Sequence, residues 1–229
     1  MTMPFYVSPE QVIADKSKFA RNNIAKGRAL LAMQYADGIL IAAENPSNTI
    51  RKIAEIYDRI AFGGVGKINE FDQLRQYGVR FADVRGYQYS REDVHARDLA
   101  NAYGQILGQT FTHDLKPMEV EILVAEVGHE NAAGDELYRV TFDGLFVDEH
   151  GFCVLPSDAE AVSSKLKESY SDDLSLQDAV KIALKSLEAA LPPDRKLTAP
   201  DIEAAVLERK ARRRAFRRLE DAEMESLFA

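Results

Sequence analysis

A threonine directly after the initiating methionine is the residue of this sequence best suited to nucleophilic chemistry. If Met1 were removed, the hydroxyl of Thr2 would lie beside a free α-amine that could act as its general base. Such a nucleophile must begin a core strand, because the sheet then fixes its geometry. Thr2 instead precedes a short arm and a helix, and Arg28 stands where the first strand is expected to open. We therefore expect Thr2 to be chemically idle, with a self-processed N-terminal nucleophile hydrolase as the alternative.

Other patterns that could bind a metal or a phosphate are weak. The histidines show no ligand-type spacing: His95, His113, His129 and His150. The single cysteine, Cys153, forms no CxxC pair and is typical of a small buried hydrophobe in a reducing compartment. The glycine cluster at 63–66 lacks both the Walker pattern and the G-x-G-x-x-G spacing, so it indicates close backbone packing. We expect no catalytic residue, no metal site and no cofactor.

A basic run near the C-terminus carries a second alternative, a nucleic-acid-binding module through residues 209–218. Its cations are Arg209, Lys210, Arg212, Arg213, Arg214, Arg217 and Arg218. A net charge of −8 and the lone aromatic Phe216 oppose this hypothesis, because stacking platforms need several aromatic side chains. We favour a solvated strand or turn, neutralised by the acidic residues that follow it: Glu220, Asp221, Glu223 and Glu225. No nucleic-acid partner is expected.

The composition is that of an ordinary globular chain, with 229 residues, 46% hydrophobic and 29% charged. No secretory n-region and h-region open the sequence, and no stretch approaches the roughly 18 consecutive apolar residues of a membrane-spanning helix. We expect a cytoplasmic protein with no membrane partner. Because neither a linker nor an internal repeat is visible, residues 1–229 are predicted to form a single domain.

The N-terminal segment is predicted to be an arm followed by a helix. Residues 1–7 form a short apolar arm, and residues 8–27 carry the helix signals. Ser8 is a natural N-cap and Pro9 suits the first helical position. Gly27 is placed to stop the helix.

The remaining core, residues 28–229, groups its strands in hairpins and its helices in pairs. Asp37-Gly38 and Asp58-Arg59 are the predicted turns of two hairpins. Strands are predicted at 29–35, 39–43, 52–57, 60–65, 120–127, 137–142, around 153, at 202–207 and at 215–218. Helices are predicted at 68–84, from a cap at Ser90 to 112, from caps at Ser157 and Ser175, and at 220–227. This grouping favours an α+β class with antiparallel sheets rather than a parallel sheet.

Short motifs in order along nearly the whole chain resemble those of proteasome alpha subunits, most closely the actinobacterial type. They include Ser8-Pro9-Glu10-Gln11, Phe19-Ala20-Arg21, Tyr35-Ala36-Asp37-Gly38-Ile39-Leu40, Glu44-Asn45-Pro46-Ser47, Gly66-Lys67-Ile68-Asn69-Glu70-Phe71, Lys116-Pro117-Met118-Glu119 and Arg214-Ala215-Phe216-Arg217-Arg218. The resemblance implies a four-layer αββα sandwich, similar to N-terminal nucleophile hydrolases, with an N-terminal helix extension.

The resemblance also implies a function. Members of the family form a heptameric alpha ring that caps a ring of catalytic beta subunits and gates the passage of unfolded protein. The alpha subunits themselves are non-catalytic members of a threonine endopeptidase complex. The implied partners are further copies of this chain, a proteasome beta subunit, a ring-shaped proteasomal ATPase or other activator docking through its C-terminal tail, and unfolded substrates in transit. In the actinobacterial type this places the chain in the prokaryotic ubiquitin-like protein pathway.

Residue by residue, Lys52 matches the lysine of the family's pocket for activator tails, where an ammonium pairs with a terminal carboxylate. Gly27 and Gly66 match glycines lining that pocket, and Lys26 adds positive potential. The alternative for Lys52 is a surface lysine beside Glu44 or Glu55, in an exposed pair that contributes ~0–1 kcal/mol. Gly27 and Gly66 could likewise serve only as a helix stop and a helix start.

The gate candidate implied by the resemblance is the arm together with the start of the helix: Phe5, Tyr6, Ser8 and Pro9. Its alternative is an ordinary disordered terminus. One departure is the sequence Leu155-Pro156-Ser157-Asp158, where related subunits carry a glycine-containing turn. That turn lies near the active site of beta subunits, so its loss agrees with a non-catalytic member.

Overall fold

Two five-stranded antiparallel sheets form the centre of the protein. The computed structural model describes residues 8–47, 49–129 and 134–228. The first sheet has the order β10 (Phe216–Leu219), β9 (Ile202–Glu208), β2 (Gly38–Glu44), β1 (Leu30–Tyr35) and β8 (Phe152–Leu155). The second has the order β3 (Ile53–Tyr57), β4 (Ile60–Gly66), β5 (Val120–Glu126), β6 (Glu136–Val140) and β7 (Phe146–Glu149). Every ladder in the described part of the chain is antiparallel, as predicted.

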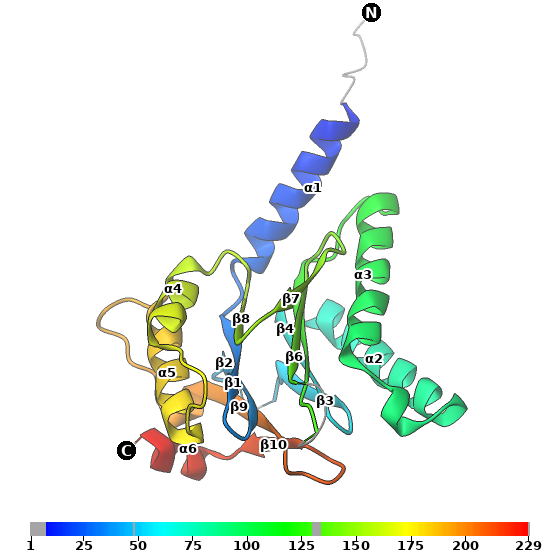
Figure 1. Ribbon diagram of the computed structural model, residues 1–229. Helices are drawn as coiled ribbons and strands as arrows, with labels where there is room; N and C mark the ends of the chain where they lie inside the picture. The colour runs from blue at the N-terminus through cyan, green and yellow to red at the C-terminus, as the bar shows by residue number, and fades with distance from the viewer. Residues whose placement is uncertain (1–7, 48, 130–133, 229) are drawn as a thin grey trace, which may run out of the picture.

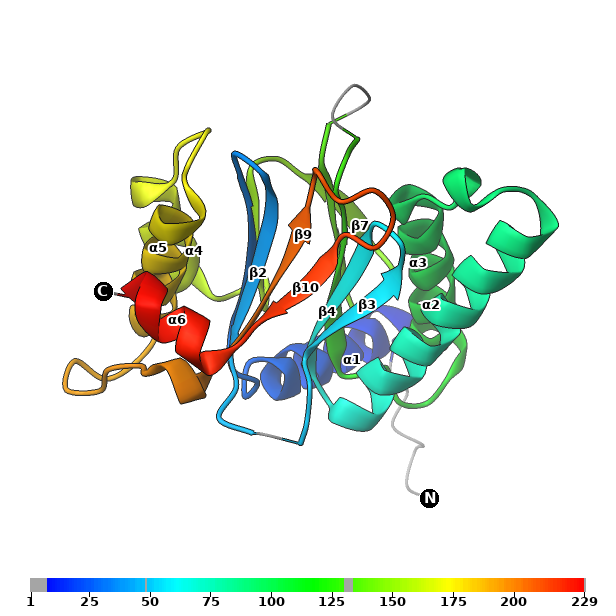
Figure 2. The same cartoon turned by 90° about the horizontal axis from the view of Figure 1, so that it is seen from below.

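Helices cover the outer face of each sheet, which gives four layers (Figures 1 and 2). Helices α4 (Glu160–Ser169), α5 (Leu176–Glu188) and α6 (Asp221–Phe228) pack on the first sheet, and α2 (Ile68–Gln88) and α3 (Ala96–His113) pack on the second. Three apolar clusters fill the spaces, one between the sheets and one under each helical layer. Because side chains alternate across a strand, each strand except β7 supplies both the inter-sheet cluster and an outer one. This is the αββα sandwich of the predicted α+β class.

Helix α1 (Pro9–Ile24) projects from one end of the sandwich (Figure 1). Ser8 is its N-cap, and its hydroxyl accepts a hydrogen bond from the amide of Gln11 at 3.2 Å. The last turn brings Ala20 and Ile24 into the cluster between the sheets. The predicted helix therefore exists, but it ends at Ile24, three residues before Gly27.

The glycine-rich strand β4 is a regular strand despite the low β-propensity of its glycines. A methyl group on Gly63 would lie 2.9 Å from Leu30 Cδ1, and one on Gly64 would lie 3.0 Å from Phe71. The glycines thus let β1 and α2 approach β4 from its two faces, which confirms the predicted close backbone packing.

Four details differ from the sequence-based expectations. The β1–β2 turn consists of residues 36–37, because Tyr35 pairs with Gly38 and the glycine begins β2. Ser90 caps only the short 3-10 helix η1 (Arg91–Asp93), and α3 starts at Ala96, whose amide donates to the Glu126 carboxylate at 2.6 Å. Ser157 does not cap α4, because it donates its amide and hydroxyl to Glu121 at 2.7 and 2.8 Å. Strand β7 was not expected.

Candidate functional site

Among the described residues, the segment before strand β1 carries no hydroxyl or thiol nucleophile. Residues 25–29 connect α1 to β1, and none of them is a serine, threonine or cysteine. The Arg28 guanidinium instead forms an ion pair with Glu44 at 2.9 Å. Thr2 lies outside the described residues and precedes, in the sequence, a helix of 16 residues. The expected helix before the first strand is thus present, and the expected arm lies outside the described residues.

The sequence-predicted residues Gly27, Lys52 and Gly66 lie together at this point, in what we call the Lys52 cluster (Gly27, Arg28, Lys52 and Gly66). The ammonium of Lys52 donates to the backbone carbonyl oxygen of Arg28 at 2.7 Å. A methyl group on Gly27 would lie 3.2 Å from the amide nitrogen of Gly66 and 2.7 Å from Val65 Cγ1. Lysine and both glycines therefore meet where α1, β1 and β4 converge.

Both glycines are required by the backbone at this convergence. Gly66 has φ +112°, and a side chain there would strike the carbonyl oxygen of Glu119. Gly27 donates its amide to the Ile24 carbonyl at 2.8 Å and closes the turn after α1. The prediction that Gly27 follows the end of the helix is thus correct. A glycine is needed there because a side chain would collide with β4, not because the backbone is left-handed.

The Lys52 side chain is half-buried and carries no direct carboxylate partner among the described residues. Glu44 binds Arg28 and Arg195 instead, at 2.9 and 2.8 Å, and Glu55 binds Arg214 at 2.6 Å. The described residues therefore show no ion pair of Lys52 with Glu44 or Glu55. Burial lowers the pKa of Lys52 to about 8, with Glu44 raising it, Arg28 lowering it and Glu203 raising it.

A buried carboxylate, Glu203 on β9, fixes the backbone that carries Lys52. It accepts hydrogen bonds from the amides of Lys52 and Ile53 at 2.8 and 3.2 Å. It also accepts from the Asn45 side chain at 2.7 Å and pairs with Arg218 at 2.7 Å. Because four donors converge on one carboxylate, the loop between β2 and β3 is held at both of its ends. Sequence reasoning missed this support, since Asn45, Lys52 and Ile53 are each at least 150 residues from Glu203.

Lys26 points away from the cluster, because its ammonium donates to Asn23 Oδ1 at 2.8 Å. A neighbouring group that was not predicted lies after Gly66. The Glu70 carboxylate binds Lys67 and Lys116, both at 3.2 Å, and accepts the amide of Glu119 at 2.6 Å. This group connects the motifs at 66–71 and 116–119. The only signal in the sequence for that contact is that both motifs occur in the family pattern. Ser8 and Pro9 start α1, whereas Phe5 and Tyr6 lie outside the described residues.

The basic run at 209–218 is largely paired with carboxylates within the fold. Its ion pairs are Arg209 with Asp135, Lys210 with Asp37, Arg213 with Asp58, Arg214 with Glu55, Arg217 with Glu208 and Glu223, and Arg218 with Glu203. Of the acidic residues that follow the run, only Glu223 takes part in these pairs. The predicted source of the neutralising charge was therefore mostly wrong. Asp37, Glu55, Asp58 and Asp135 come from strands and turns that are distant in the sequence, whereas Glu203 and Glu208 precede the run on β9.

Among the described residues, no group of three or more His, Cys, Asp or Glu side chains is arranged to hold a metal ion. No helix in that part of the chain is long and apolar enough to cross a membrane.

The fold places the chain in the class of helix-covered, two-sheet sandwiches similar to N-terminal nucleophile hydrolases, with a helix preceding the first strand. The family model described as Proteasome subunit matches residues 24–207, which begin at the end of α1. A proteasome subunit alpha from Nocardioides sp. is 55% identical over 100% of this chain and 90% of the relative. Another from Thermomonospora curvata is 52% identical over 100% of this chain and 99% of the relative, and one from Parafrankia sp. is 49% identical over 100% and 97%. The chain belongs to the proteasome subunit family, as an alpha-type member of the actinobacterial kind.

Proposed function

We propose that the chain is a non-catalytic ring subunit of a cytoplasmic proteasome core. Seven copies form an outer ring on a ring of beta subunits, and the N-terminal arms gate the axial passage of unfolded protein. The main observation behind this proposal is that Arg28, not a nucleophile, precedes β1. Helix α1 lies before Arg28 in the chain. The relatives named alpha align with the whole chain, including this helix.

The Lys52 cluster is proposed as this chain's part of a docking site for the C-terminal tail of an activator such as a ring ATPase. A neighbouring copy completes the site. The Lys52 ammonium donates to one carbonyl and has no carboxylate partner among the described residues, so it is available to a terminal carboxylate. The glycines at 27 and 66 let the segment after α1 pack against β4 beside this ammonium, and both glycines stay partly exposed. Lys52 donates to the carbonyl of Arg28, which follows α1 in the chain. A tail bound to Lys52 would therefore act on the segment that joins α1 to the body.

Binding of a tail peptide is expected to weaken as the pH rises through about 8. The free site has a Lys52 pKa of about 8, and pairing with a carboxylate raises that pKa, so binding takes up a proton above pH 8. Affinity should therefore be constant near pH 6–7 and fall by up to about tenfold per pH unit above 8. Fluorescence anisotropy of a labelled tail peptide on the assembled particle measures the profile. Lys52→Arg should flatten it, because the guanidinium remains charged; an unchanged profile in Lys52→Arg would assign the titration to another group.

The alternative of an N-terminal hydrolase predicts that Thr2 carries activity. We expect the isolated chain to hydrolyse no peptide, and Thr2→Ala to leave the peptidase rate of particles assembled with a beta subunit unchanged. Intact-mass analysis of the chain, together with a fluorogenic peptidase assay, makes the comparison. Hydrolysis by the isolated chain that disappears in Thr2→Ala would favour the hydrolase instead.

A further inference from the structure

The first two turns of helix α1 stand free of the rest of the described protein. Residues 9–15 are all exposed, and their side chains form no hydrogen bond or ion pair with the described body. The buried residues of the helix, Ala20 and Ile24, lie in its last turns. At 1.5 Å per residue, Ser8 stands about 24 Å beyond Ile24, so a tilt of about 10° at the base moves Ser8 by about 4 Å. Whatever fixes the direction of α1 therefore fixes where the arm begins.

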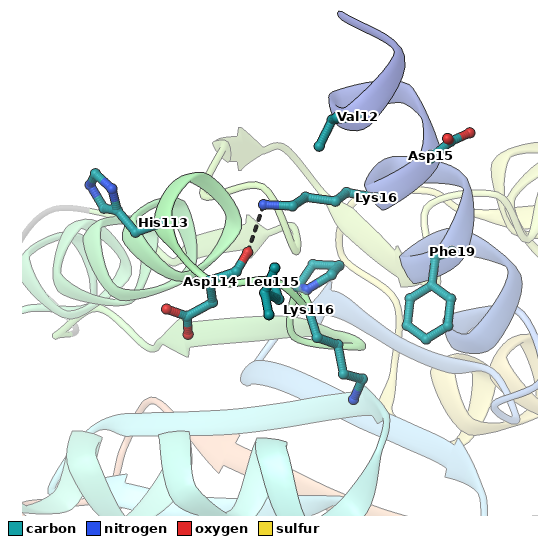
Figure 3. A pocket seen from close by; sticks show the side chains of 9 residues that line it. Val12, Asp15, Lys16, Phe19, His113, Asp114, Leu115 and Lys116 are labelled. Atoms are coloured by element: carbon teal, nitrogen blue, oxygen red, sulfur yellow. Dashed lines mark hydrogen bonds between the residues drawn. The ribbon is translucent and has the colours of Figure 1, made fainter. Parts of the chain in front are cut away.

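Lys16 is the residue nearest the tip of α1 that reaches the body. Its ammonium donates to the carbonyl oxygens of Phe111 and Asp114 at 3.0 and 2.6 Å. Phe111 lies in the last turn of α3, and Asp114 is its C-cap residue. Figure 3 shows the Lys16 side chain extending from α1 to Asp114. A cation at this position satisfies carbonyls that lack helical partners and favours the negative end of the α3 dipole.

The apolar side chains beside Lys16 do not hold the tip half of α1 against the body. Beside Lys16, a groove of about 530 Å³ separates α1 from residues 113–117, and Val12, Phe19 and Leu115 stand on its walls (Figure 3). Leu115 is fully exposed, and Val12 and Phe19 are each more than 40% exposed. Within the described chain, the tip half of α1 is thus tied to the body by a polar link across an open groove.

We propose that Lys16 is a positioning residue, which sets the direction in which α1 leaves the body and thereby the point from which the gate arm starts. This inference rests on the proposed gating function. The bond joins α1 to α3 and does not involve the Lys52 cluster. Breaking it should therefore loosen the gate without preventing the binding of an activator tail.

The test uses Lys16→Met in particles assembled with the beta subunit. Methionine keeps the apolar stem but cannot donate to the carbonyls. Amide exchange in residues 9–16 is expected to rise roughly fivefold or more, while exchange in the sheets is unchanged. Hydrolysis of an unfolded protein without activator should rise several-fold, with tail-peptide affinity unchanged. Lys16→Arg has a guanidinium that can donate to both carbonyls, so it should restore wild-type amide exchange and hydrolysis.

Lys18→Met is the matched control, because it removes the same charge from the same helix. Lys18 is exposed, and its side chain has no hydrogen-bond or ion-pair partner among the described residues. If Lys16→Met matches wild type in exchange and hydrolysis, or if Lys18→Met has the same effect, the proposal is overturned.

Deleting residues 2–8 separates this proposal from the gating function. If deletion opens the particle and Lys16→Met does not, gating stands and the positioning proposal fails. If deletion has no effect, the gating function fails. In that case amide exchange alone decides whether Lys16 orients α1, and unchanged exchange rejects it.

Discussion

Particles lacking residues 2–8 of this chain should hydrolyse an unfolded protein at least several-fold faster than wild-type particles without activator. The deletion removes the apolar part of the arm that would associate at the ring axis, including Phe5 and Tyr6. It leaves the body of α1 and its buried anchors Ala20 and Ile24 in place. The rate for a short fluorogenic peptide should increase less, since a small substrate is less hindered by a narrowed pore. Casein hydrolysis by the two particles, at equal peptidase content, measures the effect.

A length-matched variant shows whether the chemistry of the arm or only its bulk closes the pore. Phe5→Ser with Tyr6→Ser keeps the length but removes the apolar surface for association between arms. If apolar association closes the gate, this variant should open it nearly as far as the deletion does. Equal casein hydrolysis by wild-type and deleted particles would remove the arm from the account.

Lys52→Ala is expected to reduce stimulation by an activator tail about 10- to 100-fold while leaving assembly unchanged. The substitution removes the one ammonium of the Lys52 cluster that can form a charge-assisted hydrogen bond with a terminal carboxylate. Such a bond contributes about 1.5–3 kcal/mol. Assembly should persist because Glu203 holds the loop through the backbone amides of Lys52 and Ile53, not through the lysine side chain. Tail-peptide titrations of peptidase activity, with size-exclusion profiles of the particles, measure both parts.

Two control variants test whether the effect of Lys52→Ala comes from the lost charge at this position. Lys52→Arg keeps the charge and should retain most of the stimulation at pH 7. Lys26→Ala should have little effect, because the Lys26 ammonium is bound to Asn23 rather than to the Lys52 cluster. Undiminished stimulation in Lys52→Ala would remove Lys52 from the docking site.

Local signals in the sequence were sufficient for most of the fold. The apolar face of α5 and its cap at Ser175 are both present, and the cap hydroxyl accepts the Asp178 amide at 3.1 Å. The turn at Asp58-Arg59 was also correct, with Tyr57 paired to Ile60. Strand β7 escaped prediction because it is a short edge strand whose side chains are exposed or half-buried, so its apolar alternation is weak.

Ser157 shows why a local capping pattern can mislead. The sequence after it has the spacing of a helix start, but Glu121 lies within hydrogen-bond distance in the fold and takes both of its donors. Burial raises the pKa of Glu121, and the two bonds from Ser157 oppose that shift. A partner 36 residues away cannot be read from a pattern of four residues.

The proximity of three of the predicted residues could be anticipated from the sequence, but the contacts that support them could not. Gly27, Lys52 and Gly66 were named through the family resemblance, and the fold brings them together. The carbonyl of Arg28, the two arginines on Glu44 and the donors on Glu203 depend on long-range strand order. Spacing along the chain carries no signal for such contacts.

Electron microscopy of this chain co-expressed with a proteasome beta subunit tests the central claim most directly. We expect rings of seven copies at the outer ends of the particle, with α1 facing the axial opening and no side chain modified at the head of β1. A solitary chain with a different fold, or a map with a reactive hydroxyl in the position of Arg28, would contradict the account.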